Sequence, residues 1–367
     1  MSAPVTIELD QTPIRLSPRE IGRVLALVPE NGELVAQLKD KAFANVISSK
    51  IGEDGAPVDA TVRLVNGRPK VIPAKPGVEL EASQISDAFV AALQKSGAER
   101  TLSVEKQVAN ADFTTRDAEK LGVKEKISSF TTEFPYAEYR NINIGRAAEI
   151  VNNTLIKPGE TFSLNKTVGE RTAANGFTTG FMISNGIFKE DYGGGVSQMA
   201  TTSFNAGFFG GMTDVEHKPH SFYIDRYPVG REATVAWPSL DMAWKNDTPY
   251  GVLIQSYLHK ATPGSKGSVT VTLWSTKYWD ITTKTGERYN FTSPATRTLT
   301  TSDCVSNSGY GGFDINVWRY WRKHGSDELV RTEKFHTTYT PSDTVICKDP
   351  PKPKPKPTKQ TPPPARD

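Results

Sequence analysis

The feature that most constrains this chain is a run of three glycines, Gly193–Gly195, directly before a helical pattern in "DYGGGVSQMATTSFNAGFFGGM" (residues 191–212). Glycine adopts positive φ at no steric cost and lets another backbone or a ligand come close. The first N–H groups of the following helix lack partners within the helix and favour an anion. The stretch therefore predicts either a structural turn with Ser197 as the helix N-cap, or a pocket in which Ser197 faces a ligand.

Three common glycine-rich motifs fail at this position. A P-loop requires a lysine after the glycines, and none follows them. A dinucleotide-binding fingerprint requires glycine where Gln198 stands, and the Gly-x-Ser-x-Gly elbow of serine hydrolases requires glycine where Met199 stands. The stretch therefore gives no reason to expect a nucleotide, and no cofactor is predicted.

A second polar cluster follows in "EHKPHSFYIDRYPVGRE", residues 216–232. His217 and His220 are three residues apart, but Pro219 prevents a helix from presenting both to a metal ion. Further zinc ligands are not evident, so no metal site is predicted. The histidines are interpreted either as ordinary core or surface residues, or as a base or orienting group near Ser197.

The same cluster contains two arginines, Arg226 and Arg231. The planar fork of a guanidinium group matches the geometry of a carboxylate. The two residues are interpreted either as carboxylate-binding groups or as surface arginines without a partner.

The charge of the chain argues against nucleic acid as a partner. The formal net charge is +3, and residues 348–367 alone carry +4, because they hold five lysines and one arginine against two aspartates. This tail also contains eight prolines, and it predicts a disordered, polyproline-II-like extension. No apolar run approaches the ~18 residues of a membrane span. A cytosolic protein fits these facts, and so does an ectodomain without its anchor.

The chain has two cysteines, Cys304 and Cys347, and both lie in one C-terminal segment. They are interpreted either as two buried thiols or as a disulfide that closes the segment. The second interpretation implies an oxidising compartment.

The first part of the chain, residues 1–110, alternates strand and helix patterns. Ser17 and Glu20 form a capping box before a helix, and Asn66-Gly67 predicts a β-hairpin. Residues 31–51 place apolar side chains at helical spacing and predict one continuous helix. A small α+β domain is therefore expected here.

The rest of the chain predicts further segments of different character. Residues 111–140 are interpreted as a connector and 141–277 as a central domain. Residues 278–348 are expected to form a β-rich module, with a hairpin around 324–327, and 349–367 a disordered tail. The predicted fold class is α+β and multidomain, with mixed sheets and a few helices.

Four stretches of the central region resemble the VanW family of bacterial cell-envelope proteins. They are "NIGRAAEIVNNTLIKPGETFSLNKTVGERTAANGF", "YGGGVSQMATTSFNAGFFGG", "EHKPHSFYIDRYPVGREATVAW" and "WKNDTPYGVLIQS". The resemblance covers about residues 141–257. More loosely, the first ~130 residues resemble the peptidoglycan-binding domain that precedes VanW in YoaR-like proteins. The segment from Cys304 to Cys347 resembles small β-rich modules of actinobacterial members, and a disulfide is expected to close it.

The resemblance implies an extracytoplasmic place in the cell envelope and peptidoglycan as the partner. It also implies an N-terminal transmembrane anchor, which is absent from this chain. Some members are regarded as L,D-transpeptidases, which form an acyl-enzyme on the cysteine of a Gly-Gly-Gly-Val-Cys-Gln pattern. Ser197 stands at the position of that cysteine, and His220 matches the family's histidine in a His-Ser pair.

Serine in place of cysteine leaves several hypotheses. A thiol has a pKa of ~8.5, which a helix N-terminus lowers, whereas a serine hydroxyl needs a well-placed base. One hypothesis is therefore a wall-binding protein without turnover, whose basic tail lies along anionic wall polymers. A second is a serine-dependent acyl transferase in which Ser197 attacks a stem carbonyl and His220 accepts its proton. In that case the amides of residues 196–198 stabilise the oxyanion. A third is an adaptor for a partner protein.

In the wall-binding hypothesis a groove at the glycine turn and the N-terminal domain bind peptidoglycan through its peptide stem or its glycan. In the acyl-transfer hypothesis the groove holds the stem. The residues expected to bind it are Gly193, Gly194, Gly195, Gln198, Thr201, His217, Ser221, Arg226 and Arg231.

Overall fold

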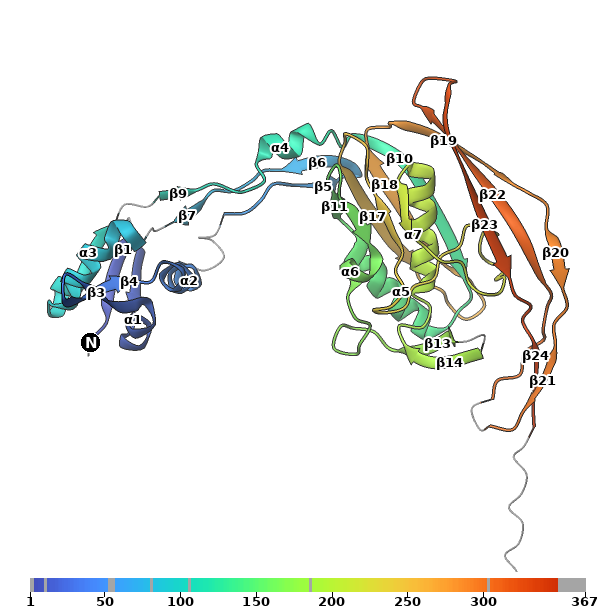
Figure 1. The fold of residues 1–367 in the computed structure, drawn as a ribbon, viewed down its shortest axis with the longest axis horizontal. Coiled ribbons are helices and arrows are strands. Elements are labelled where there is room, and N and C mark those ends of the chain that lie inside the picture. Colours follow the sequence, from blue (N-terminus) through green and yellow to red (C-terminus); the bar gives the residue numbers. More distant parts are fainter. Residues whose placement is uncertain are drawn as a thin grey trace, which may run out of the picture. The chain divides into compact units, whose positions relative to one another are not determined.

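The computed structural model describes residues 3–9, 12–51, 57–79, 82–104, 107–184, 187–301 and 304–348. The basic tail that the sequence predicts at 349–367 lies outside the described residues. The chain divides into two compact units, Met1–Lys124 and Glu125–Asp367, and each is described by itself (Figure 1).

The first unit is built on a three-stranded sheet in the order β2–β1–β8, in which β1 is antiparallel to β2 and parallel to β8. The strands are β1 (Val5–Leu9), β2 (Thr12–Leu16) and β8 (Thr101–Val104), and the helices are α1 (Pro18–Val24), α2 (Asp40–Ile51) and α3 (Ala82–Leu93). Apolar side chains from these strands and helices form one core, which includes Ile7, Leu16, Ile21, Phe43 and Phe89.

The capping box predicted at the start of α1 is confirmed. The Ser17 hydroxyl accepts the Glu20 N–H at 3.4 Å, and the Glu20 carboxylate accepts the Ser17 N–H at 2.8 Å. Hydrogen bonds from Ser17, and then from Lys50 at 2.9 Å, lower the pKa of Glu20 to about 2. The stability that this carboxylate contributes is therefore present above pH 4.5 and is lost as the pH falls toward about 2.

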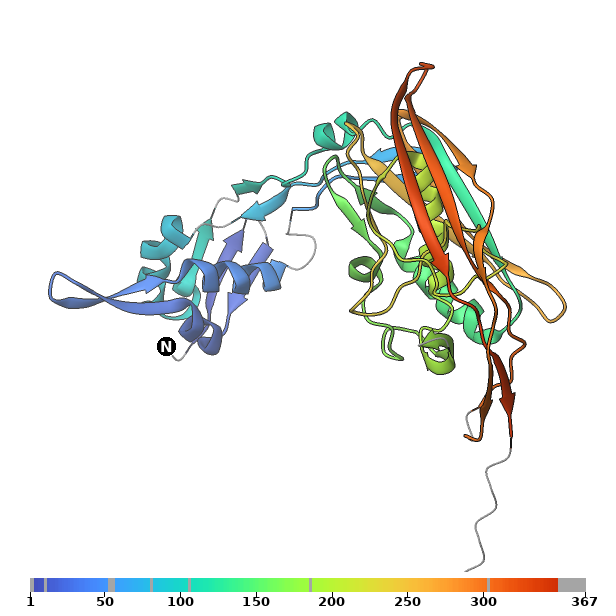
Figure 2. The same cartoon turned by 45° about the vertical axis from the view of Figure 1, so that its right-hand side comes forward.

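The single helix predicted over residues 31–51 is wrong for residues 31–39. Strands β3 (Leu25–Glu30) and β4 (Glu33–Leu38) form an antiparallel hairpin, and α2 begins only at Asp40 (Figure 2). The turn consists of Asn31 and Gly32, with φ of 52° and 86°. Two positive φ angles are the requirement of a type I′ hairpin turn, so the Asn-Gly pair overrides the helical spacing of the apolar residues.

The second Asn-Gly pair forms the hairpin that the sequence predicts. Strands β5 (Thr61–Val65) and β6 (Arg68–Ile72) pair across Asn66-Gly67, whose φ angles are 54° and 73°. The remaining elements of this unit are β7 (Gly77–Glu79), the 3-10 helix η1 (Gly97–Arg100), β9 (Gln107–Ala109) and α4 (Thr115–Lys120).

The second unit is built on an antiparallel sheet in the order β10–β18–β17–β11. Its strands are β10 (Glu125–Phe134), β11 (Thr154–Ile156), β17 (Val252–His259) and β18 (Gly267–Ser275). Helix α7 (Ser197–Gly210) packs on β10 and β18, and α5 (Glu138–Val151) packs mainly on β17. Part of the segment interpreted as a connector is thus an edge strand of this sheet.

Smaller elements surround the two helices. A three-stranded sheet has the order β12–β16–β15, and β13 pairs with β14 in a hairpin. The bounds are β12 (Thr161–Ser163), α6 (Leu164–Val168), β13 (Thr179–Ser184), β14 (Ile187–Tyr192), β15 (Thr213–Glu216) and β16 (Ala243–Lys245). The predicted α+β fold with mixed sheets and few helices is therefore confirmed.

The C-terminal part of this unit is a twisted sheet centred on the long strand β22. The strands β22 (Gly312–Lys323) and β23 (Leu329–Tyr339) form the predicted hairpin, while β19 (Trp279–Thr285) and β20 (Tyr289–Thr292) also pair with β22. The short strands β21 (Thr296–Leu299) and β24 (Thr344–Cys347) form a separate parallel pair. We call these six strands and their loops, residues 279–347, the C-terminal module.

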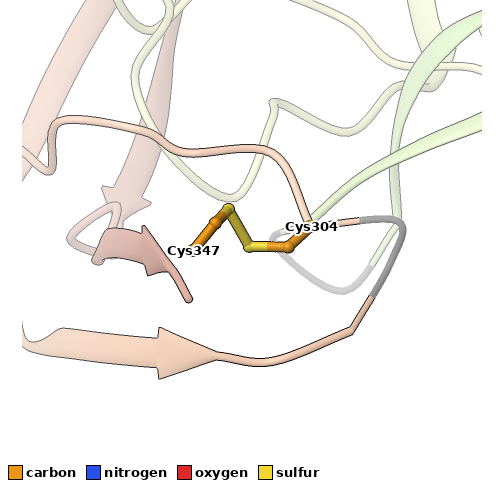
Figure 3. Close-up of a disulfide and its surroundings, with 2 residues drawn as sticks. All are labelled: Cys304 and Cys347. Atoms are coloured by element: carbon orange, nitrogen blue, oxygen red, sulfur yellow. A yellow bond between two sulfur atoms is a disulfide. The ribbon is translucent and has the colours of Figure 1, made fainter. Parts of the chain in front are cut away.

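The predicted disulfide is confirmed. Cys304 and Cys347 are bonded, with their Cα atoms 5.7 Å apart (Figure 3). The bond ties the loop after β21 to the end of β24. Among the described residues, no helix has the length and apolar character needed to cross a membrane.

The C-terminal module is anchored on α7 by a buried arginine. Arg319 of β22 is 1% exposed, and its guanidinium lies 4.6 Å from the ring centroid of Phe208. It donates to the carbonyl of Met212 at 3.0 Å from both terminal nitrogens. The guanidinium thereby satisfies a carbonyl just beyond the C-terminal end of α7, where positive charge is favourable.

The capping box gives a testable expectation for the first unit. Replacing Ser17 with Ala is expected to cost about 1 kcal/mol of local stability, because an N–H at the start of α1 loses its acceptor. Hydrogen exchange of peptides that span α1 should then be about fivefold faster.

The matched control is Ser96→Ala. Ser96 precedes η1 at the N-cap position but makes no side-chain capping bond there. Equal exchange rates in the Ser17→Ala variant and the wild type would show that the capping box contributes nothing.

Candidate functional site

The three glycines form a turn that the protein's own atoms surround closely. Gly193 and Gly195 have φ of 77° and 94°, which side chains rarely tolerate. A Cβ on Gly194 would lie 2.5 Å from the carbonyl carbon of Gly180 in β13. The Gly194 carbonyl accepts a hydrogen bond from the buried amide of Asn143 in α5 at 3.0 Å. The turn is therefore clamped between α5 and β13.

Ser197 is the first residue of α7, and not its N-cap. The N-cap position belongs to Val196, which has helical φ and ψ and makes no side-chain capping bond. The Ser197 hydroxyl accepts a long hydrogen bond, 3.4 Å, from the N–H of Val235. Its side chain is half-buried and lines an open groove.

The N-terminus of α7 offers fewer free backbone N–H groups than the sequence suggested. The Val196 N–H donates to Gly193 O at 3.0 Å, and the Gln198 N–H donates to Gly195 O at 2.9 Å. Within the described part of the chain, only the Ser197 N–H of these three has no acceptor. An oxyanion hole made of all three amides is therefore excluded in this geometry.

The groove next to Ser197 has a volume of about 1450 Å³. One wall is formed by the glycine turn and by residues 218–227 and 234–236. The other wall belongs to the C-terminal module, at residues 291–294, 310–313 and 340–343. The groove thus lies within the second unit, between the N-terminus of α7 and the C-terminal module.

His220 lines the same groove and is held by a buried carboxylate. Its Nδ1 atom lies 2.5 Å from Oε2 of Glu232, and Glu232 is 0% exposed. The hydroxyl of Tyr339, at the end of β23, donates to the other Glu232 oxygen at 2.6 Å. No hydrogen bond joins His220 to Ser197, or occupies the Nε2 atom of His220, among the described residues. The free ring nitrogen is therefore available to the groove.

The imidazole of His220 also stacks on a buried tyrosine. The rings of His220 and Tyr227 are 5.3 Å apart and nearly parallel, at 19°. The Tyr227 hydroxyl donates to the Gln198 side chain at 2.8 Å, and Gln198 in turn donates to Thr132 at 2.6 Å. Gln198 is 2% exposed and therefore positions Tyr227 from behind the groove.

The groove carries more positive than negative side chains. The cationic residues that line it are Arg140, Lys218, Arg226, Arg288 and Arg297, and the carboxylates are Asp225 and Asp343. Arg297 pairs with Asp343 at 2.6 Å, whereas the other four cations form no ion pair among the described residues. A site of this kind attracts an anion.

The three unpaired guanidinium groups each lie over an aromatic ring, and those of Arg226 and Arg288 come closest to a ring centroid. Arg226 lies 4.7 Å from the ring centroid of Tyr227. Arg288 lies 4.3 Å from that of Phe313 and 4.8 Å from that of Tyr223. Stacking of this kind holds the plane of the guanidinium and leaves its N–H groups free to meet a carboxylate.

Residues 139–274 match the family model described as VanW like protein. These residues are a VanW-like domain. The resemblance noted in the sequence is thereby confirmed for the central region, and the domain contributes Ser197, His220 and Arg226 to the groove. The assignments of the N-terminal domain and of an actinobacterial subgroup remain predictions.

Two bacterial proteins are similar to this chain over different lengths. The chain is 27% identical over 246 residues to the uncharacterized protein YoaR of Bacillus subtilis. The matched stretch covers 66% of this chain and 73% of that protein. It is 29% identical over 120 residues to the vancomycin B-type resistance protein VanW of Enterococcus faecalis, and the chain spans 43% of the length of that protein. No solved structure matched the chain.

The structure brings part of the predicted site set together. Besides Ser197 and His220, the groove is lined by four of the residues predicted to bind the stem, which are Gly193, Gly195, Ser221 and Arg226. Gly194 is buried against β13. Among the residues that the structure describes, no cluster of side chains is suited to hold a metal ion.

The other predicted residues lie outside the groove lining. Thr201 is fully buried and donates to the carbonyl of Ala233 at 3.0 Å. His217 lies 2.7 Å from Asp214, and its ring stacks on a core phenylalanine. Arg231 is inserted among the aromatic side chains of α7, and burial lowers its pKa. A ligand role for these three residues, and for the buried Gln198, which is also outside the lining, remains a prediction.

Sequence reasoning missed the two residues that hold His220. Glu232 is 12 residues further along the chain and ends the polar cluster already noted, but nothing in that spacing pairs it with His220. Tyr339 is 107 residues away from Glu232, in a different part of the fold. Only the packing of the C-terminal module on the VanW-like domain brings Tyr339 to this place.

Three tyrosines around the groove make the protein sensitive to alkali. Burial raises the pKa of Tyr227 and of Tyr339, and it raises the pKa of Tyr310 to about 12, from an ordinary value of 10.0. In the unfolded chain these groups lose protons near pH 10, while the folded protein keeps them. The unfolded state then binds fewer protons, so stability falls as the pH rises from about 10 to about 12.

Urea unfolding at several pH values checks this expectation. The free energy of unfolding should be steady up to about pH 9.5 and should then decline. A Tyr310→Phe variant should decline less steeply than the wild type. Tyr257→Phe, at an exposed position, is the control and should follow the wild type. Identical slopes for Tyr310→Phe and the wild type would contradict the assignment.

Proposed function

We propose that this protein acts in the bacterial cell envelope, where the groove binds the peptide stem of peptidoglycan. The observation that carries this proposal is the set of four unpaired cations in a groove beside the glycine turn of a VanW-like domain. Peptide stems present carboxylates, and stacked guanidinium groups are well suited to bind them. The relatives add support, because one of them is named for vancomycin resistance.

The size of the groove supports an extended ligand. Small-molecule pockets usually enclose about 300–1,000 Å³, whereas this groove encloses about 1450 Å³. The exposed ring of Phe291, in the wall formed by the C-terminal module, offers an apolar surface beside the guanidinium groups. A chain of alternating charged and apolar groups fits such a wall.

The disulfide supports a location outside the cytoplasm. Bonds of this kind persist in oxidising compartments and are rare where glutathione keeps thiols reduced. The Cys304–Cys347 bond lies near the groove wall at Leu299 and Val345, so its formation bears on the proposed site. We also propose that the tail at 349–367 contacts anionic wall polymers through its lysines.

Binding of soluble muropeptides tests the main proposal. Wild-type protein should retain them at low salt, and the Arg226→Ala/Arg288→Ala double variant should bind about tenfold more weakly, because charge-assisted hydrogen bonds are lost. Isothermal titration with disaccharide-peptides released from sacculi is the measurement.

Arg322→Ala is the control variant. Arg322 lies on the same module outside the groove lining and donates to the Asp327 carbonyl. It should bind as the wild type does. Equal affinity of the double variant and the wild type, or no binding by the wild type at low salt, would overturn the proposal.

A second candidate function is serine-dependent acyl transfer on the peptide stem. The specific observation in its favour is that Ser197 and His220 line one groove while Glu232 holds the far nitrogen of the imidazole. A nucleophile, a base and a group that orients the base form the usual arrangement for such chemistry. Because Ser197 and His220 are not hydrogen-bonded in this state, substrate binding must bring them within reach.

The acyl transfer would proceed in two steps, through an ester on Ser197. Ser197 Oγ attacks a stem carbonyl carbon, and its proton passes to Nε2 of His220. The C–N bond to the terminal residue breaks, and that residue leaves as an amine with the proton returned by His220. An amine of another stem, or water, then attacks the ester and restores the serine hydroxyl. The Ser197 N–H is the backbone donor left for the oxyanion.

Muropeptide profiles of Ser197 variants test this candidate. Ser197→Ala should lower release or exchange of the terminal residue at least a hundredfold while muropeptides still bind, and Ser197→Cys should retain or raise turnover. Ser265→Ala, which removes an exposed hydroxyl of the same unit outside the groove lining, is the control. A wild-type profile as inert as that of Ser197→Ala would exclude acyl transfer and leave the binding proposal standing.

A further inference from the structure

One buried hydroxyl of the C-terminal module reaches the carboxylate that holds His220. Tyr339, at the last position of β23, is 1% exposed. Its hydroxyl donates to Oε1 of Glu232 at 2.6 Å and accepts the N–H of Gly230 at 2.9 Å. The N–H of Gly230 therefore fixes the hydroxyl from one side, and the hydroxyl proton is directed at the carboxylate.

Glu232 depends on this hydroxyl. The carboxylate is fully buried, and a buried carboxylate without hydrogen-bond donors is strongly unfavourable. Among the described residues its donors are His220 Nδ1 and the Tyr339 hydroxyl, one on each oxygen. No ion pair with lysine or arginine contributes within the described residues. The position of Glu232, and hence of His220, is therefore set jointly by these two partners.

We infer that Tyr339 is a positioning residue, which acts through Glu232 to keep His220 in the tautomer with its proton on Nδ1 and its Nε2 lone pair facing the groove. The inference rests on the acyl-transfer candidate only for its catalytic consequence, since only that reaction uses His220 as a base. The tautomer itself is a property of the protein without substrate. In this view the C-terminal module completes the site of the VanW-like domain.

The tautomer follows from the chemistry of the three groups. An ionised carboxylate only accepts hydrogen bonds, so Nδ1 must carry a proton in order to bond Glu232. Neutral imidazole then has an unprotonated Nε2. Burial, together with the charge of Glu232, raises the pKa of Tyr339, so its hydroxyl keeps the proton that it donates.

The surroundings contain other groups that act on the imidazole. Tyr227 stacks on it, and the Arg226 guanidinium lies 4.7 Å from the centroid of the Tyr227 ring. The groove adds Arg140, Lys218, Asp225 and Tyr310. None of these bonds the Nδ1 atom, whereas the Tyr339–Glu232 pair is the one hydrogen-bonded connection to it that the structure describes. The tautomer of His220 is therefore a specific readout of the Tyr339–Glu232 pair.

Nitrogen NMR of the full chain tests the inference. Long-range proton–nitrogen correlation spectra separate the two neutral tautomers, and a His220→Asn variant assigns the signals of His220 among the five histidines of the chain. Wild type should show the Nδ1–H form. Tyr339→Phe keeps the ring in place and removes one hydroxyl, and it should reduce the Nδ1–H population of His220 to less than half.

Two further variants make the result decisive. Glu232→Gln should abolish the Nδ1–H preference, because an amide has both a donor and an acceptor for the imidazole. Tyr289→Phe removes a tyrosine hydroxyl of the same module that bonds His336 at 3.3 Å, and it should leave His220 unchanged. Circular dichroism establishes that each variant is folded.

The outcomes separate the positioning role from the reaction. Loss of the Nδ1–H form in Tyr339→Phe supports the inference, even if no muropeptide is turned over. A wild type with the proton on Nε2 overturns it, and so does a Tyr339→Phe spectrum equal to that of the wild type. If turnover is found, Tyr339→Phe should lower kcat and change the pH profile of kcat, with KM nearly unchanged.

Discussion

Helix α7 is buried around its whole circumference, and the second unit is arranged by the way its polar side chains find partners. Thr132 of β10 bonds Thr202 at 2.6 Å, and Ser128 of the same strand donates to the Ala206 carbonyl at 2.7 Å. On another side, Thr201 bonds both the N–H and the carbonyl of Ala233. Buried polar groups without partners are costly. These bonds therefore fix both the rotation of the helix about its axis and its position along that axis. Because Ser197 is the first residue of α7, its position is fixed with that of the helix.

Some of this arrangement was predictable because local chemistry decides it. The capping box at Ser17 and the Asn-Gly turn at Asn66 depend on neighbouring residues, and both formed as expected. The helix predicted over 31–51 failed over residues 31–39, because the Asn31-Gly32 turn is a stronger local signal than helical spacing. Helical position also put Thr201 beside Ser197, but a helix enclosed on all sides turns that face toward Ala233.

The site was less predictable than the elements that carry it. Ser197, His220 and Arg226 were found because they stand next to recognisable patterns, and they do line one groove. Glu232 and Tyr339 were missed, since a long-range hydrogen bond leaves no periodicity in the sequence. The other unpaired cations of the groove were missed for the same reason: Arg288 reaches the groove only through the pairing of β20 with β22.

The bond between Cys304 and Cys347 has a consequence for how the molecule is handled. It ties the loop after β21 to the end of β24, and these two strands form a parallel pair with much of their surface in water, so little apolar packing holds them. Arg297 and Asp343, which line the outer rim of the groove, sit on or beside these strands. Protein produced in a reducing cytoplasm would therefore keep the core around α7, while strands β21 and β24 at the rim of the groove would separate. Preparation under oxidising conditions decides whether the rim is measured in its closed form.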